Sequence, residues 1–152
     1  MSKKPINIVW LKRDLRTQDH QCLAHAEKAG IDYRIVYFFE PHIICYPDTS
    51  ERHLQFIYHS IAAINKTLAP FNRSVDVFYA SALTIFEYLS SNFNIQHIYS
   101  YRESGTKLTW DRDKKVASFT KKNKIYWKEF QRNGILRGIK NRIDWSKHWH
   151  VK

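Results

Sequence analysis

Glycine is scarce in this sequence, with four in 152 residues, and the positions of the glycines exclude two common nucleotide-binding motifs. Gly30, Gly105, Gly134 and Gly138 do not fit G-x-G-x-x-G, whose glycines let the backbone approach a pyrophosphate closely. They do not fit G-x-x-x-x-G-K-[ST] either, the loop that surrounds phosphates in P-loop proteins. The sequence therefore argues against classical NAD binding and against P-loop chemistry.

Cysteine is rarer still, and long apolar runs are missing. Cys22 and Cys45 are too few for a disulfide framework, and each lies in or beside an apolar run. We therefore expect both to be reduced thiols in the core of a cytoplasmic protein. No apolar stretch approaches the roughly 20 residues of a membrane span, and the first residues lack the apolar segment of a secretory signal. We predict a cytoplasmic location and no membrane partner.

Histidine is present, but its spacing does not predict a metal site. His148 and His150 form H-x-H near the end of the sequence, without a convincing third or fourth ligand. We interpret His20 as part of a turn, and we predict no metal. No Ser-His-Asp or paired-carboxylate arrangement can be argued from residue order, so we assign no catalytic residue to this chain.

Positive charge is in excess, with a formal net charge of +11, and almost all of the excess lies in the last third. Residues 1–100 contain ten Lys and Arg against nine Asp and Glu, a net charge of +1. Residues 101–152 contain fifteen against five, a net charge of +10. Such a surface can attract phosphate groups, or it can be a solvated helix face followed by a basic tail.

Strand and helix signals alternate along a chain whose 43% hydrophobic content is typical of a globular protein. Apolar runs rich in β-branched and aromatic residues predict strands at 6–11, 33–39, 75–79, 95–101 and around 125–127. Helical spacing predicts helices at 21–29, 82–93 and about 106–120, and one that follows Asp48 and stops at Pro70, with a loop at 42–48. We expect Asp19 and Ser81 to cap two of these helices, and Asp48 to form a capping box with Glu51.

The predicted helix between Asp48 and Pro70 has the clearest amphipathic pattern. Its apolar residues recur at steps of three and four, which places them on one face. They are Leu54, Ile57, Ile61, Ile64 and Leu68. We predict that this face is buried against a sheet.

The alternation of strands and helices indicates the α/β class and a doubly wound, Rossmann-like, five-stranded parallel sheet. We expect strand order 3-2-1-4-5, helices on both faces, and a domain that spans residues 1–130. Residues 131–152 remain as a basic tail or interdomain connector, with Leu136, Ile139 and Ile143 at helical spacing.

Charged residues follow three of the predicted strands where each one ends. Ligands bind outside the carboxyl ends of strands in open α/β sheets, so these residues are candidate binding residues. They are Lys12, Arg13, Asp14, Arg16, Phe39, Glu40, Arg102 and Glu103. We expect the side chains of Arg13, Glu40 and Glu103 to lie close enough to share a ligand. Asp14 fits either this site or a purely structural turn.

The stretch at 10–20, W-L-K-R-D-L-R-T-Q-D-H, resembles the opening of the DNA photolyase/cryptochrome family, usually written W-F-R-R-D-L-R-x-x-D-N. Further resemblances follow in order at 38–41, at 101–103 with 110–113, and at 129–134 with 139–142. The resemblance implies an N-terminal α/β domain that can hold an antenna chromophore, which is a folate, a deazaflavin or a flavin. The family has Asn-Glu or Glu-Tyr-Glu after the fourth strand where residues 103–106 read E-S-G-T, so the identity of the antenna stays open.

The resemblance also implies a longer parent protein. FAD would be bound in a C-terminal helical domain that this chain lacks, and that domain would be the main partner. The parent would be a photolyase-type lyase that repairs pyrimidine dimers in damaged DNA with light, or a blue-light sensor. Two alternatives remain from the residues alone: a free-standing doubly wound domain that binds a nucleotide or effector, and a basic adaptor that binds nucleic acid through residues 101–152.

Overall fold

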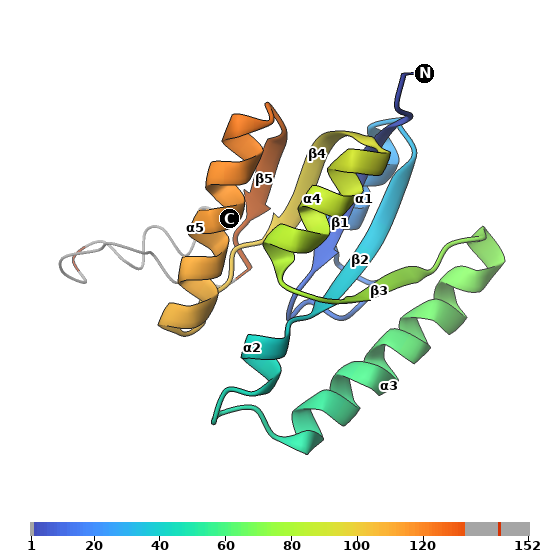
Figure 1. Cartoon of the computed structure of the whole chain (residues 1–152). Helices are drawn as coiled ribbons and strands as arrows, with labels where there is room; N and C mark the ends of the chain where they lie inside the picture. The colour runs from blue at the N-terminus through green and yellow to red at the C-terminus, as the bar shows by residue number, and fades with distance from the viewer. Residues whose placement is uncertain (1, 133–142, 144–152) are drawn as a thin grey trace.

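The computed structural model describes residues 2–132 and residue 143, and it forms one parallel sheet with helices on both faces (Figure 1). The sheet has five strands in the order β3-β2-β1-β4-β5, which confirms the predicted order and fold class. The predictions about the tail concern residues that lie, apart from 131, 132 and 143, outside the described part. None of the described helices is both long and apolar enough to cross a membrane.

The elements lie close to the predicted ones. The strands are β1 (Pro5–Leu11), β2 (Tyr33–Phe39), β3 (Val75–Tyr79), β4 (Asn94–Tyr101) and β5 (Tyr126–Phe130). The helices are α1 (Gln21–Lys28), α2 (Pro41–Ile44), α3 (Glu51–Leu68), α4 (Ala82–Asn92) and α5 (Lys107–Lys122), with a 3-10 turn, η1 (Ala69–Phe71), after α3. The short helix α2 occupies part of the stretch that we expected to be a loop. It begins at Pro41, a residue whose fixed φ suits the first position of a helix.

The two faces of the sheet are covered by different helices because strands are added on one side of β1 up to β3 and on its other side from β4 onward. Right-handed crossovers place α1 and α3 on one face as the chain moves from β1 to β3. They place α4 and α5 on the other face as it moves from β3 to β5. Figure 1 shows α4 in front of the sheet and α1 behind it.

Each face has its own buried core, because alternate residues of β1 point to opposite sides. Ile6, Ile8 and Trp10 pack with residues of α4 and α5, whereas Val9 and Leu11 pack with residues of α1 and α3. Trp10 is at the centre of the first core. Its ring centroid lies 5.2 Å from that of Phe86, 5.4 Å from that of Phe38 and 5.9 Å from that of Trp127.

Two predicted helix caps are wrong by one or two positions. His20, not Asp19, caps α1, and its Nδ1 accepts a hydrogen bond from the Leu23 N–H at 3.3 Å. Asp19 instead has a φ of 49°, in the left-handed region. Ser50 and His53 form the capping box of α3 in place of Asp48 and Glu51, because Asp48 is taken up in the turn that follows α2.

The amphipathic pattern of α3 is confirmed only at its centre. Ile61 and Ile64 are 6% and 5% exposed, but Leu54, Ile57 and Leu68 are only partly buried. Leu54 and Ile57 line a cavity between the first half of α3 and the sheet, so the helix does not pack closely there. The prediction for Cys45 is also wrong, since it is exposed at the end of α2 while Cys22 is buried.

We expect Ile61→Ala to lower the free energy of unfolding by about 2–5 kcal/mol, because it leaves a cavity against the sheet. Tyr58→Ala is the matched control, since Tyr58 lies on the same helix and is 67% exposed. It should change the free energy of unfolding by less than about 0.5 kcal/mol. Chemical denaturation measures both, and equal losses would contradict the packing of α3 described above.

Candidate functional site

A cavity of about 650 Å³ opens at the carboxyl ends of β1, β2 and β4. This is the position at which open α/β sheets bind ligands. One wall is apolar, and it is formed by β2, α2 and the first half of α3. Its residues are Tyr37, Phe39, Ile43, Ile44, Tyr46, Leu54, Phe56 and Ile57. The other side consists of charged side chains that follow β1, β2 and β4, together with the first two turns of α5.

Arg112 is at the centre of the charged side. Its Nη1 lies 3.0 Å from Glu40 Oε1, and its Nη2 lies 2.5 Å from Glu103 Oε2 and 2.8 Å from Asp113 Oδ1. Glu40 also accepts a hydrogen bond from the Ala82 N–H at 2.9 Å, at the start of α4. One guanidinium therefore joins the ends of β2 and β4 to α5, and through Glu40 to α4.

Two further cations complete the group. Lys12 Nζ lies 3.2 Å from Asp113 Oδ2 and 4.2 Å from the centre of the Trp10 ring, so it connects the charged group to the core. Arg13 Nε donates to Glu103 Oε1 at 2.9 Å. Three cations thus face three carboxylates: Lys12, Arg13 and Arg112 against Glu40, Glu103 and Asp113. We call these six residues the charge network.

The pKa values of Glu103 and Arg112 favour the ionised form of each side chain. Burial on its own would raise the pKa of Glu103, but the charge of Arg112 and its hydrogen bond hold this pKa below its ordinary value. Burial would lower the pKa of Arg112, yet Asp113, Glu103 and Glu40 together raise it. Lys12 is different, since burial lowers its pKa in spite of the opposing charge of Asp113.

The loop after β4 approaches α5 so closely that it needs a glycine. A Cβ built on Gly105 would lie 2.3 Å from Thr109 Oγ1 and 3.3 Å from Glu103 Oε1. Thr109 is buried in the first turn of α5, so the contact cannot be relieved easily. The small residue therefore lets the loop place Glu103 between Arg13 and Arg112.

The structure separates the predicted site residues into two groups. Lys12, Arg13, Phe39, Glu40 and Glu103 line the cavity, and Arg13, Glu40 and Glu103 lie together through Arg112 as we expected. The residues placed outside it are Asp14, Arg16 and Arg102.

Those three side chains satisfy neighbouring groups instead. Arg16 donates to the carbonyl oxygens of Gln18 and Asp19 in its own loop. Arg102 lies 3.9 Å from Glu129 on β5. Asp14 accepts the Lys12 N–H at 2.9 Å, which supports the structural alternative for this residue.

Arg112 is the site residue that the sequence pattern did not single out. It lies on α5, nine residues after Glu103, and it reaches the edge of the sheet only because α5 starts there. The W-D-R-D stretch at 110–113 was the available signal, since the helix dipole disfavours an arginine near a helix start unless it has acidic partners. Residue order did not identify those partners.

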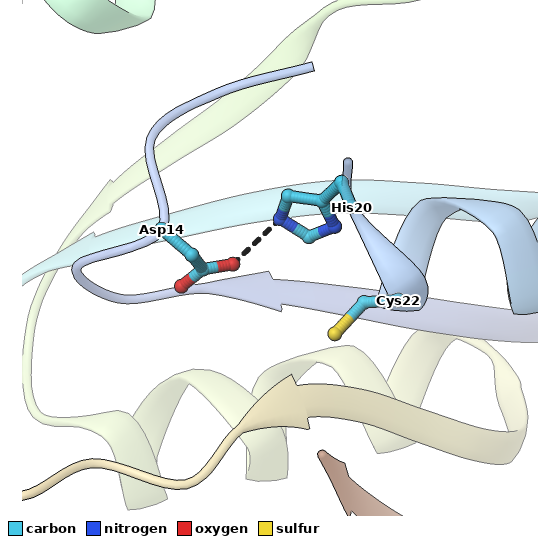
Figure 2. Close-up of side chains that lie close together, drawn as sticks. All are labelled: Asp14, His20 and Cys22. Atoms are coloured by element: carbon cyan, nitrogen blue, oxygen red, sulfur yellow. Dashed lines mark hydrogen bonds and ion pairs between the residues drawn. The ribbon is translucent and has the colours of Figure 1, made fainter. Parts of the chain in front are cut away.

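Asp14, His20 and Cys22 form a second buried cluster, at the start of α1 (Figure 2). Their potential ligand atoms lie within 4.8 Å of one another. His20 Nε2 lies 2.6 Å from Asp14 Oδ2, while His20 Nδ1 accepts the Leu23 N–H. Nδ1 therefore carries no proton, and Nε2 must donate to Asp14.

These bonds leave the cluster poorly suited to a metal or to nucleophilic catalysis. Both nitrogens of His20 are occupied, so neither can bind an ion or take a proton from Cys22. Burial also raises the pKa of the Cys22 thiol, and the charge of Asp14 raises it further. Burial would raise the pKa of Asp14 too, but its bonds to His20 and to the Lys12 N–H lower it below the ordinary value. We interpret the cluster as a structural clasp between the loop after β1 and α1.

Comparison with known proteins gives a family match and a set of similar folds. A family model described as DNA photolyase matches residues 7–139, which is most of the chain. No curated protein matches the sequence. A cryptochrome from Synechocystis sp. PCC6803 has a TM-score of 0.78 and 21% sequence identity, over 86% of this chain and 28% of that one.

Two photolyases have similar structures. The archaeal photolyase from Sulfolobus tokodaii, solved with two FAD molecules, has a TM-score of 0.76 and 21% identity over 97% of this chain and 35% of its own. The bacterial class III photolyase from Agrobacterium tumefaciens has a TM-score of 0.69 and 21% identity over 86% and 26%. At this identity the likeness shows the fold. The chain spans about a quarter to a third of the length of these proteins.

We expect a water-soluble thiol reagent to modify Cys45 in the native protein and to reach Cys22 only after unfolding. The thiolate is the reactive form, and Cys22 is buried with a raised pKa whereas Cys45 is exposed. Cys45→Ser should abolish the fast reaction. Two fast thiols in the native wild-type protein would contradict the buried clasp.

We expect stability to fall in acid partly because Glu103 becomes protonated. A carboxyl group whose pKa is depressed by folding stabilises the fold above its unfolded pKa, and this contribution is lost as the pH falls through the folded pKa. The stability difference between wild type and Glu103→Gln should therefore be constant above about pH 5 and shrink below the ordinary value of 4.5. Urea unfolding across this range measures it, with the exposed Glu51→Gln as control. Parallel profiles for wild type and Glu103→Gln would show that Glu103 is not coupled to folding.

Proposed function

The chain belongs to the DNA photolyase family, and we propose that its α/β domain holds an antenna chromophore in the cavity at the carboxyl edge of the sheet. The chromophore would be a folate, a deazaflavin or a flavin. The observation that carries this proposal is the cavity itself, with an apolar and aromatic wall opposite a charge network whose charges are already paired. Such a site suits a planar heteroaromatic ring with polar edges.

The walls of the cavity support a ring-shaped ligand. Tyr37 and Phe39 lie on β2 and face the same side of the sheet, with ring centroids 5.0 Å apart in an edge-to-face arrangement. Across the cavity, the carboxylates of Glu40 and Glu103 keep lone pairs that can accept hydrogen bonds from ring N–H groups. The network is held from several elements, so the ligand would meet a preorganised surface.

The remaining roles belong to a longer protein. The family match supports a parent in which residues 131–152 connect to a helical domain that binds FAD, and so does the fact that this chain covers only 28% and 35% of two similar structures. That parent would act on damaged DNA as a light-driven photolyase-type lyase, or would sense blue light. The α/β domain would then supply excitation energy and would dock on the flavin domain, in the cytoplasm.

Titration with riboflavin, a deazaflavin and a tetrahydrofolate tests the antenna site. We expect at least one of these ligands to bind saturably, as measured by its fluorescence or absorbance. Phe39→Ala should bind that ligand at least about tenfold more weakly, because aromatic packing is lost. Tyr79→Ala is the matched control, since Tyr79 pairs with Phe39 in the sheet register but lies outside the cavity. Failure of all three ligands to bind would refute the proposal, as would equal effects of the two substitutions.

A further inference from the structure

We propose that the antenna carries an acidic group, a phosphate or a carboxylate, and that Arg13 binds this group at the mouth of the cavity. The inference rests on the proposed antenna site and specifies which chemistry that site selects. It depends on the geometry of Arg13, on the charge balance around it, and on the way in which its side chain is held.

Arg13 presents the free end of its guanidinium to the cavity. Its side chain lines the cavity and is 66% exposed, whereas those of Lys12, Glu40, Glu103 and Arg112 are all at least nine-tenths buried. Nε is engaged by Glu103 at 2.9 Å. Within the described residues, Nη1 and Nη2 of Arg13 have no protein acceptor. Two adjacent N–H groups in one plane match the two oxygens of a carboxylate or phosphate.

The charges next to Arg13, at the opposite end of the cavity from Asp48, leave one cation in excess. The charge network is balanced, with three cations and three carboxylates. Arg132 adds a fourth cation, because its Nη1 donates to the Arg13 carbonyl oxygen at 3.2 Å. The three carboxylates lie deeper than Arg13 and are all paired, so the surplus positive charge lies at the exposed guanidinium groups.

The two ends of the cavity also differ in charge. Asp48 lines it from the turn between α2 and α3 and is exposed, so an acidic group would be repelled at that end. Arg13 comes from the loop after β1 at the charged side. A ligand with a planar ring and an acidic tail would therefore place the ring against Tyr37 and Phe39 and the tail at Arg13.

Glu103 acts as a positioning residue for Arg13. Its Oε2 is held by Arg112, and its Oε1 accepts from Arg13 Nε, so the plane of the Arg13 guanidinium is set by a buried carboxylate. A long arginine side chain held at Nε loses less conformational entropy when it binds a ligand than a free one does. The exposed Arg13 is thus prepared for binding without being buried.

Riboflavin and flavin mononucleotide test the phosphate arm, because they share one ring system and differ by a phosphate. We expect the intact 152-residue chain to bind the mononucleotide at least about tenfold more tightly at low salt, with the ratio shrinking as salt is added. Arg13→Gln should remove the preference, so that its affinity for the mononucleotide falls to its affinity for riboflavin. Arg102→Gln also loses one loop guanidinium, but one outside the cavity, so it should retain the preference.

A second ligand pair tests the carboxylate arm. Tetrahydrofolate carries glutamate carboxylates that the corresponding tetrahydropterin lacks. A preference for the acidic member of either pair that depends on Arg13 supports the proposal, and the pair that shows it identifies the acidic group. Arg13→Lys keeps the positive charge but lacks the two coplanar N–H groups of the guanidinium, so it should retain only part of the preference.

The outcomes separate this inference from the antenna site. Equal binding of the acidic and neutral members, or a preference that survives in Arg13→Gln, would overturn the role of Arg13 while leaving the antenna site intact. Absence of binding by all four ligands and by a deazaflavin would refute the antenna site, and the inference with it. Thermal unfolding of each variant verifies that the fold is retained, as we expect for a side chain that is two-thirds exposed.

Discussion

The carboxyl edge of the sheet depends on the buried guanidinium of Arg112. It contacts carboxylates from three segments: Glu40 after β2, Glu103 after β4 and Asp113 on α5. Burying these charges costs desolvation free energy, which is offset only where each charge has an opposite partner at hydrogen-bond distance. Without the guanidinium, three carboxylates would lie close together with too little positive charge to balance them. The three segments are therefore held in one arrangement.

The same group connects the site to the core. Lys12 directly follows β1 and is buried, and its ammonium group lies over Trp10 while it pairs with Asp113. Trp10 in turn contacts aromatic rings from β2, α4 and β5. A substitution that shifts Trp10 would thus also shift the charged side chains at the cavity. This coupling would keep the walls of the proposed antenna site in one arrangement.

Some site residues were identifiable from the sequence because strand ends place them. Arg13, Glu40 and Glu103 each follow a strand, and parallel strands bring their carboxyl ends to one edge. Arg16 and Arg102 follow strands as well, but their side chains satisfy nearby carbonyl oxygens and Glu129. Which way a loop side chain turns depends on the acceptors around it, and those acceptors come from several parts of the chain.

The sequence by itself determined the fold class, the strand order and the family resemblance. These follow from local hydrophobic periodicity, from the handedness of crossovers and from the motif at 10–20, all of which can be read along the chain. Only the tertiary structure decided that Arg112 joins the site, that Asp14 belongs to the clasp with His20 and Cys22, and that the first half of α3 lines a cavity. The physical reason is that pairing of buried charges and space between elements are properties of segments far apart in sequence. Neither has a local pattern.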